Sequence, residues 1–347
     1  MSLIQILLYP IAIIWSLVLS LRNYFYNLGI IPSYTSKFPI ICVGNIVLGG
    51  SGKSPTVMLI VQELLNRGYT PILLTRGYGG KISSFHQVTE QDTSILIGDE
   101  ALMMYHKFPT TPFFIAPKRV FAVRKIEQLY ANEINPIIVL DDGYQHRALN
   151  RDCNLLLVDV CTHGVEGGLI DSQIFPSGTL RESFQSGIDR ASAIILISRE
   201  AFNDQVLLSI KNQWKKYSKP VFILSLESGN FVDIVLGREV SASHFENKKV
   251  FIFSSIAKPD QFLLMLKKKI NNIVGYKYYR DHFSYDQKDI EFLISQDSDY
   301  LITTEKDAAK IKELTNIKNK FYALRLQPRV VGDTLDNMIV EIENFLK

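Results

Sequence analysis

The sequence predicts an α/β fold in which a mainly parallel sheet carries helices on both faces. Short apolar segments alternate along the chain with longer amphipathic ones, and the apolar segments are continuous rather than alternating with polar residues. Continuous apolar strands are typical of a sheet that is covered on both sides. With 347 residues, of which 47% are hydrophobic, the chain is long enough for two domains with buried cores.

Composition excludes several classes of protein. The 38 Lys and Arg residues nearly balance the 35 Asp and Glu residues, so the chain lacks the basic excess of a nucleic-acid-binding protein. The three cysteines form no CxxC pair and have no spacing typical of secreted proteins. We therefore expect no nucleic-acid partner, no disulfide framework, and a reducing compartment.

Residues 1–24 are predicted to be a hydrophobic, membrane-associated helix. No charged residue or histidine occurs before Arg22, and a helix over residues 3–21 would be roughly 28 Å long, close to the hydrocarbon thickness of a bilayer. Cations that follow the apolar segment disfavour a cleaved signal peptide and favour a cytoplasmic location for the remaining chain. Polar residues within the segment leave three arrangements open: a spanning helix, an interfacial helix, or a helix docked on protein.

Residues 25–219 are predicted to form the core of the protein. Two amphipathic segments, residues 55–66 and 119–130, are predicted to be helices between buried strands. The predicted strands are residues 39–44, 71–75, 112–116, 137–140, 154–160 and 193–198.

Residues 220–347 are predicted to form a smaller C-terminal α/β lobe, because the same alternation starts again near Pro220. Its expected strands begin near Pro220 and cover residues 249–255, 273–279 and 300–304. Its expected helices lie near residues 260–269 and 286–295, with a final helix that runs to Lys347.

A phosphate-binding loop is the sharpest local signal. The segment GNIVLGGSGKS, residues 44–54, follows a predicted strand and precedes a predicted helix. In such a loop, glycines turn backbone N–H groups toward phosphate oxygens, the lysine reaches the β- and γ-phosphates, and the final hydroxyl binds Mg²⁺. Val47 replaces the first glycine of the usual spacing, so the loop is a variant. The residues predicted to bind ATP are Gly49, Gly50, Ser51, Gly52, Lys53 and Ser54.

Two adjacent acids provide a candidate magnesium site. Asp141 and Asp142 follow the apolar segment 137–140, at the carboxyl end of a predicted strand. Ligands of parallel sheets bind at this edge, where a P-loop enzyme needs a carboxylate near its Mg²⁺. We expect one of the two acids to contact the metal together with Ser54. Which one does so is left open, as is the alternative of a simple Asp-Asp-Gly turn.

Seven motifs spread over almost the whole chain carry a resemblance to a known family. They are GNIVLGGSGKSP (44–55), RGYGG (76–80), IGDEALMM (97–104), LDDGYQHRALNRD (140–152), FPSGTLRES (175–183), RDHFSY (280–285) and TTEKDAAKI (303–311). Together they resemble the tetraacyldisaccharide 4'-kinases of lipid A biosynthesis. The resemblance implies a P-loop NTPase-like fold, and an ATP- and Mg²⁺-dependent transfer of phosphate to the 4'-hydroxyl of a tetraacylated glucosamine disaccharide 1-phosphate. It also implies a location at the cytoplasmic face of the bacterial inner membrane, either peripheral or through a single N-terminal anchor.

The resemblance further implies a catalytic pair. The aspartate of the family's GDE motif corresponds to Asp99 and the histidine of its DH motif to His282. A carboxylate oriented by an imidazole is suited to take the proton of the acceptor hydroxyl. The alternatives for these residues are an aspartate that caps the helix after Asp99 and a packed or surface histidine.

Three further residues are candidates by their chemistry. Arg76 and Arg181 are predicted to bind substrate phosphate or the charge that develops during transfer, and Glu182 to assist the metal. Ordinary surface ion pairs are the alternative for all three. The charged residues 305–307 follow a predicted strand, where a cleft position and a helix cap are equally good interpretations.

An alternative function remains at this stage: a membrane-tethered regulatory ATPase or GTPase that acts on a protein partner. It would share the P-loop and the two adjacent acids. It leaves Asp99, His282 and the hydrophobic first helix without a role. The kinase interpretation, by contrast, implies no protein partner, only the lipid substrate and the membrane surface.

Overall fold

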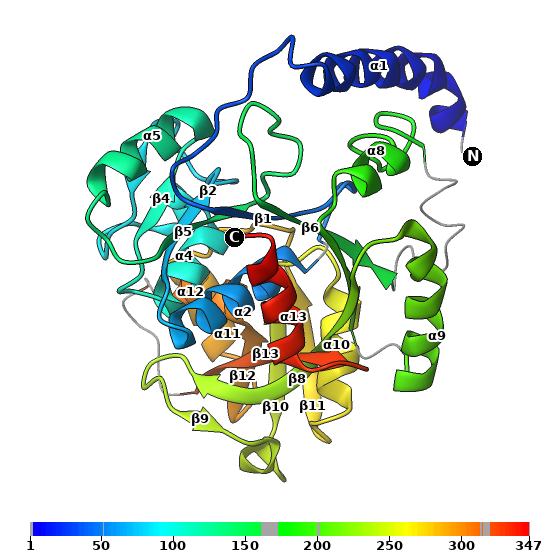
Figure 1. The fold of residues 1–347 in the computed structure, drawn as a ribbon. Helices are drawn as coiled ribbons and strands as arrows, with labels where there is room; N and C mark the ends of the chain where they lie inside the picture. The colour runs from blue at the N-terminus through cyan, green and yellow to red at the C-terminus, as the bar shows by residue number, and fades with distance from the viewer. Residues whose placement is uncertain are drawn as a thin grey trace.

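A single sheet runs through the computed structural model of the protein, which describes residues 3–50, 52–160, 173–199, 202–312, 314 and 320–346. The described residues form 13 strands in the order β11-β10-β12-β13-β8-β7-β6-β1-β5-β2-β4-β3, with β9 paired to β8 (Figure 1). Neighbouring strands are parallel except at β13–β8, β8–β9 and β3–β4. The prediction of a mainly parallel sheet with helices on both faces is confirmed.

The first half of the sheet holds the predicted core strands. Each predicted strand is present within a residue or two of its expected bounds. These strands are β1 (Ile40–Gly44), β2 (Thr70–Thr75), β4 (Phe113–Ile115), β5 (Pro136–Asp141), β6 (Cys153–Asp159) and β7 (Ala193–Ser198). The two-residue strand β3 (His86–Gln87) was not predicted. In the register, Val43 of β1 lies between Asp141 of β5 and Leu155 of β6, so the loop after β1 and the acid at the end of β5 share one edge.

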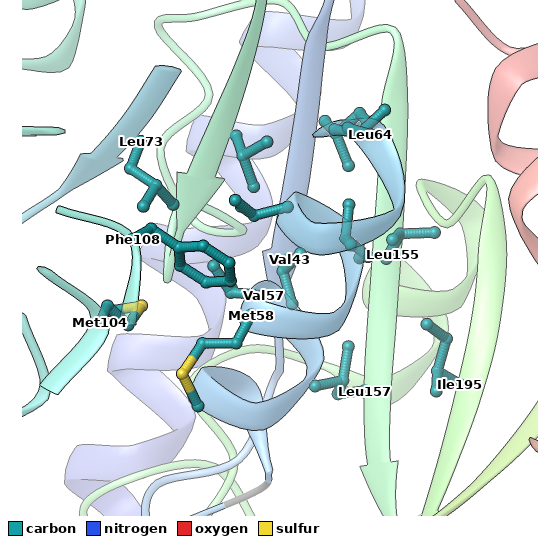
Figure 2. Close-up of a cluster of buried hydrophobic side chains, with 14 of the residues drawn as sticks. Val43, Val57, Met58, Leu64, Leu73, Met104, Phe108, Leu155, Leu157 and Ile195 are labelled. Atoms are coloured by element: carbon teal, nitrogen blue, oxygen red, sulfur yellow. The ribbon is translucent and has the colours of Figure 1, made fainter. Parts of the chain in front are cut away.

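Helices cover both faces of this half. They are α2 (Lys53–Asn66), α3 (Ser94–Ile97), α4 (Asp99–Lys107), α5 (Arg119–Leu129), α8 (Phe184–Asp189) and α9 (Asp204–Trp214). Figure 2 shows one face, where Val57, Met58 and Leu64 of α2 point toward Val43 and Leu155 of the sheet. Residues from α5, α8 and α9 form a second cluster on the opposite face.

The second half of the sheet is formed by residues 221–331, and we call this part of the molecule the C-terminal lobe. Its strands are β8 (Val221–Asp233), β9 (Glu239–Val240), β10 (Val250–Ser254), β11 (Ile273–Tyr278), β12 (Tyr300–Thr304) and β13 (Phe321–Val331). Its helices are α10 (Pro259–Lys267), α11 (Gln287–Ile294) and α12 (Glu305–Ile311), and short 3₁₀ turns occur at Lys215–Tyr217 and Ala242–Phe245. Two further apolar clusters, one on each face, bury the residues of this lobe.

Two long antiparallel strands, β8 and β13, join the halves. Near its start, Ile223 of β8 lies opposite Val331, and near its end Asp233 lies opposite Tyr322. Sequence analysis missed β13, because its second part alternates polar and apolar residues and contains Pro328, which lacks the N–H group that a sheet hydrogen bond needs. The partner strand β8 supplies the long-range pairing that fixes this segment as a strand.

The last helix, α13 (Leu335–Asn344), packs on the core. Met338, Ile339 and Ile342 are buried in the cluster that also contains the inner face of α2. Arg67, at the end of α2, forms ion pairs with Asp336 and Glu343. The chain thus returns to the first half of the sheet after it has built the C-terminal lobe.

The first helix, α1 (Leu3–Asn27), lies at the periphery of the molecule near α8 (Figure 1). Ala12, Leu19 and Asn23 share one face and are buried, and Asn23 donates a hydrogen bond to Ser186 of α8 at 3.2 Å. The rest of the helix is largely exposed although it is apolar. By length and composition the segment Gln5–Asn27 is able to cross a membrane.

Candidate active site between the two lobes

The phosphate-binding loop opens at the edge of the sheet, between β1 and α2. Gly52 adopts a left-handed conformation with φ of 77° at the start of α2, and a Cβ atom there would lie 2.8 Å from Ile197 Cγ2. Only glycine fits both constraints. Gly49 also has a positive φ, and the carbonyl of Gly50 accepts a hydrogen bond from Arg199. The remaining predicted loop residue, Ser51, lies outside the described residues.

Lys53 and Asp142 face each other across the loop. Lys53 Nζ lies 3.6 Å from Asp142 Oδ1 and 3.5 Å from Asn45 Oδ1. Arg181 Nη1 donates to both oxygens of Asp142, at 2.9 and 3.0 Å. Burial alone would raise the pKa of Asp142, but the charges of Lys53 and Arg181 outweigh it and lower that pKa below its usual range. Asp142 is therefore a carboxylate that holds the cations of Lys53 and Arg181 in place.

Asp141 has different surroundings. Its Oδ2 atom accepts a hydrogen bond from Thr75 at 3.1 Å, whereas its buried Oδ1 atom has no hydrogen-bond partner among the described residues. Burial, reinforced by the nearby charges of Glu100 and Asp142, raises the pKa of Asp141 to about 7. An unpaired buried carboxylate oxygen beside other acids favours a bound cation.

Glu100 completes this acidic corner. Ser54 Oγ, on the first turn of α2, donates a hydrogen bond of 2.7 Å to Glu100 Oε2, on the first turn of α4. Sequence analysis assigned Glu100 no role, although it adjoins Asp99 in the GDE motif. Among the described residues no three His, Cys, Asp or Glu side chains form a metal-binding group. Mg²⁺ needs no such group, because it keeps several waters and also binds phosphate oxygens.

Asp99 and His282 meet across the two lobes. Asp99 begins α4 and His282 lies in the loop after β11, yet His282 Nδ1 lies 3.1 Å from Asp99 Oδ1 and 3.0 Å from Oδ2. Gly98 has a φ of 87° and allows the sharp turn into α4. His282 has a φ of 58°, and its N–H group is bound by Asp281 Oδ1 at 3.0 Å. The local backbone thus presents both side chains to the same space.

Neighbouring charges and their mutual hydrogen bond set the pKa values of Asp99 and His282. Burial would raise the pKa of Asp99, but the hydrogen bond with His282 and the charges of Lys306 and Lys310 lower it to about 2. The hydrogen bond to Asp99 raises the pKa of His282 in return. Asp99 is consequently ionised at neutral pH and able to accept a proton.

The TTEKDAAKI motif forms the wall behind this pair. Thr304 caps α12, because its side chain accepts the Asp307 N–H group. Lys310 is buried, forms a 2.9 Å ion pair with Asp307 and donates to the carbonyl of Phe283 at 3.0 Å. Lys306 lies closer to Asp99 and His282, with its Nζ atom 3.4 Å from Asp99 Oδ2.

Glu182 is the residue predicted to assist the metal. Glu182 is buried, and both its oxygens accept hydrogen bonds from Arg190, at 2.7 and 2.8 Å. Gln145 links Glu182 to the carbonyl of Asn45 in front of the loop. These bonds favour a structural role for Glu182 over the metal role that its sequence position suggested.

Arg76 is exposed at the end of β2 and belongs to a basic cluster. Its charge acts on His146, whose pKa is lowered to about 4, first by burial and then by Arg119, Arg151, Arg22 and Arg76. A concentration of positive charges around His146 favours the binding of an anion.

A mostly apolar cavity of about 210 Å³ adjoins the phosphate-binding loop. Its walls come from both lobes and join Ser54 and the first turn of α2 to α4, α10 and the strands β8 and β13. The apolar residues that line it are Pro55, Met58, Met103, Leu226, Ile256, Phe262, Met265, Leu324 and Leu326. A second cavity borders Asp99 and His282 on the side of Gly79, Lys81 and Ser94.

Comparisons with known proteins identify the family of the chain. A sequence model of the tetraacyldisaccharide-1-P 4'-kinase family matches residues 4–343. A tetraacyldisaccharide 4'-kinase from Cytophaga hutchinsonii is 31% identical over all of this chain and 99% of its own length. One from Chlorobaculum tepidum is 32% identical over 89% of this chain and 87% of its own length.

The fold has a solved counterpart. The crystal structure of an "apo" form of LpxK from Aquifex aeolicus in complex with ATP superimposes with a TM-score of 0.78, covering 99% of this chain and 100% of the other. The two sequences are 24% identical, so this likeness shows the fold.

Proposed function

The chain belongs to the tetraacyldisaccharide-1-P 4'-kinase family, and we propose how the site between its lobes performs the family's reaction. The protein is an ATP-dependent kinase of lipid A biosynthesis that phosphorylates the 4'-hydroxyl of a tetraacylated disaccharide 1-phosphate. One observation carries the assignment of its active site: Asp99 and His282, from different lobes, meet beside the phosphate-binding loop.

Asp99 is the base in this proposal. The 4'-oxygen attacks the γ-phosphorus of ATP, the bond to the β-phosphate oxygen breaks, and the hydroxyl proton moves to the Asp99 carboxylate. Asp99 Oδ1 already accepts the Glu100 N–H group and the His282 ring. Oδ2 meets no hydrogen-bond criterion among the described residues, although His282 Nδ1 lies 3.0 Å from it, and in this proposal it is the oxygen that accepts the proton.

Lys53, Gly49, Gly50, Gly52 and the start of α2 would bind the phosphates, with Ser51 as the remaining predicted loop residue. Binding of ATP at this loop would offer Lys53 a phosphate in place of its 3.6 Å contact with Asp142. Arg181 would then remain on Asp142 and position it, and Arg76 would attract the phosphate of the lipid substrate.

The residues present fit a magnesium ion. Ser54 Oγ and the unpaired Oδ1 of Asp141 are oxygen donors at the edge of the loop, and Glu100 is hydrogen-bonded to Ser54. We assign the metal-binding role to Ser54 and Asp141, and the positioning of cations to Asp142. A bound Mg²⁺ would neutralise charge on the β- and γ-phosphates.

The nucleotide base has a place in the apolar cavity. This cavity begins at Ser54 and Pro55, so a nucleotide whose phosphates lie on the loop would direct its base between Met58 and Phe262. Because the cavity is lined from both lobes, ATP would bind between them.

The first helix would hold the protein at the membrane. Its exposed apolar side chains include Leu7, Ile14 and Leu17, each 64–68% exposed. An apolar surface of this extent is suited to lipid, and the lipid substrate resides in the bilayer. Arg22 at the end of the apolar segment favours the cytoplasmic face of the inner membrane.

Incubation with ATP, Mg²⁺ and acylated disaccharide 1-phosphate tests the proposal. We expect a lipid product that carries one additional phosphate, detected by mass spectrometry, and ADP in equal amount. ATP hydrolysis that needs no lipid and gives no phosphorylated lipid would instead support the regulatory ATPase, an alternative that the family membership does not favour.

A further inference from the structure

The first turn of α12 carries a lysine whose position the reaction does not yet explain. We propose that Lys306 is a positioning residue that holds the carboxylate of Asp99 and the ring of His282 in their reactive arrangement and makes this arrangement depend on contact between the lobes. The inference rests on the proposed role of Asp99 as the base.

Lys306 lies at the centre of four polar side chains. Its Nζ atom is 3.4 Å from Asp99 Oδ2, 3.4 Å from His282 Nε2, 3.6 Å from Asp281 Oδ1 and 3.9 Å from Glu100 Oε1. The side chain is 16% exposed, which limits screening by water. Lys306 therefore contacts both members of the pair, and on His282 it faces Nε2, the ring nitrogen opposite the one that contacts Asp99.

The contact with His282 constrains the imidazole. An ammonium group only donates hydrogen bonds, so the Nε2 atom that faces Lys306 is favoured as an acceptor without a proton. The proton of the neutral ring is then on Nδ1, where it is donated to Asp99. Asp281 also faces Nε2 but at 3.8 Å, too far for a hydrogen bond. Lys306 thus favours the tautomer in which His282 orients Asp99.

The contact with Asp99 involves the reactive oxygen. Oδ2 is the buried oxygen that lacks a hydrogen-bond partner among the described residues, and Lys306 is its nearest cation, with Lys310 at 3.8 Å. A cation at 3.4 Å stabilises the ionised carboxylate without occupying it with a short hydrogen bond. The oxygen remains able to accept the proton of the substrate.

Lys310 has a different task. Its ammonium group is bound by Asp307, Ser255 and the carbonyl of Phe283, and its side chain is only 5% exposed. Its charge is therefore largely balanced within the C-terminal lobe. Lys306 instead extends from this lobe to Asp99 and Glu100 on α4, which belong to the other lobe. Separation of the lobes would remove Lys306 and His282 from Asp99 together.

Substitution of the lysine tests the inference. We expect K306M to lower kcat about 100-fold while the KM for ATP changes less than about threefold, because positioning acts on the chemical step. K306R, which keeps the charge, should recover at least about tenfold of this loss. K312M alters an exposed lysine of the same segment and should stay within about twofold of the wild type.

A double-mutant cycle distinguishes positioning from a merely structural role. If Lys306 acts through Asp99, adding K306M to D99N should cost little more than D99N alone. The inference would be overturned if the loss of kcat in the double variant equalled the product of the losses in the two single variants. Equal losses for K306M and K306R, or a loss confined to the KM for ATP, would also overturn it. A wild-type enzyme that fails to phosphorylate the lipid would contradict the proposed function, whereas a fully active K306M would contradict only this inference. Unchanged melting temperatures and ATP affinities would show that the variants remain folded.

Discussion

Asp99 and His282 are 183 positions apart, and their contact makes each of them chemically useful. An isolated carboxylate at the start of a helix would serve as an ordinary first-turn acid. Here the imidazole and two lysines keep it ionised inside the protein, where burial alone would favour protonation. Three side chains of the C-terminal lobe therefore define the protonation state of a carboxyl group in the other lobe.

Asn at position 99 removes the proton acceptor and keeps the shape of the side chain. We expect D99N to lower kcat by about 10²- to 10⁴-fold, with ATP affinity close to that of the wild type, because the contacts of Asp99 among the described residues are with Glu100, His282 and the lysines of α12. Steady-state kinetics and titration with a fluorescent ATP analogue measure the two effects. Near-normal turnover with intact ATP binding would show that another group is the base.

Glu127 of α5 offers a test of stability at the same scale. It is buried and accepts hydrogen bonds from Tyr34 Oη, Ser36 Oγ and the Lys37 N–H group, at 2.6, 2.9 and 2.8 Å. Burial would raise the pKa of Glu127, but these hydrogen bonds lower it. Its contribution to stability is therefore present above the pKa of the unfolded chain and is lost as pH falls through the lower pKa of the folded state.

We expect E127A to reduce the free energy of unfolding by about 2 kcal/mol at pH 7, because three donors lose their acceptor. Below about pH 4 the difference in the free energy of unfolding between E127A and the wild type should shrink, because Glu127 of the wild type becomes protonated as the pH falls. Urea denaturation at several pH values measures both. A difference that stays constant from pH 7 to pH 3 would contradict the assignment.

At the scale of elements, the positions of β13 and α13 decide how the two halves of the molecule are connected. The strand β13 pairs with β12 of the C-terminal lobe and with β8, and α13 then packs against α2 of the core. The segment that follows the lobe therefore secures the helix that begins at the phosphate-binding loop. We therefore expect a change that weakens the packing of α13 to destabilise α2 as well.

Ile339 and Val340 form a matched pair for this test. Ile339 is 1% exposed against α2, whereas Val340, the next residue, is 40% exposed. We expect I339A to lower the free energy of unfolding by about 3 kcal/mol through the cavity that it leaves, and V340A by less than about 1 kcal/mol. Chemical denaturation measures both variants. Equal effects would mean that α13 does not pack on the core as described.

At the scale of the whole molecule, the distribution of exposed apolar surface indicates where the protein would contact lipid. Ala12 and Leu19 of α1 are buried against the body of the protein, while Leu7, Ile14 and Leu17 are exposed. A soluble helix would place polar residues on its outer face. The helix α1 thus presents an apolar surface that is suited to lipid.

Serine at positions 7, 14 and 17 should separate membrane binding from folding. We expect the L7S/I14S/L17S variant to lose most of its association with vesicles that contain anionic lipid, with a melting temperature within a few degrees of the wild type, since these side chains contact little protein. The matched variant L19A should instead lower the melting temperature, because Leu19 is buried. The opposite pattern in co-sedimentation and thermal unfolding would favour a helix docked on protein.

Features that depend on neighbouring residues could be predicted from the sequence. Continuous apolar segments predicted the strands β1, β2 and β4 to β7, the spacing of glycines around Lys53 predicted the loop, and the uncharged start predicted a hydrophobic first helix. Contiguous motifs were also enough to indicate the family and its reaction. Such signals are readable because they arise from local periodicity and backbone conformation.

The contacts between residues that are far apart in the sequence came from the tertiary structure. It brought His282 and Lys306 to Asp99, separated the surroundings of Asp141 from those of Asp142, and bound Glu182 to Arg190. No local pattern encodes these pairs, because contacts between lobes depend on the order of strands in the sheet and on the packing of helices against it. The sequence therefore named candidate residues, and the fold assigned their partners.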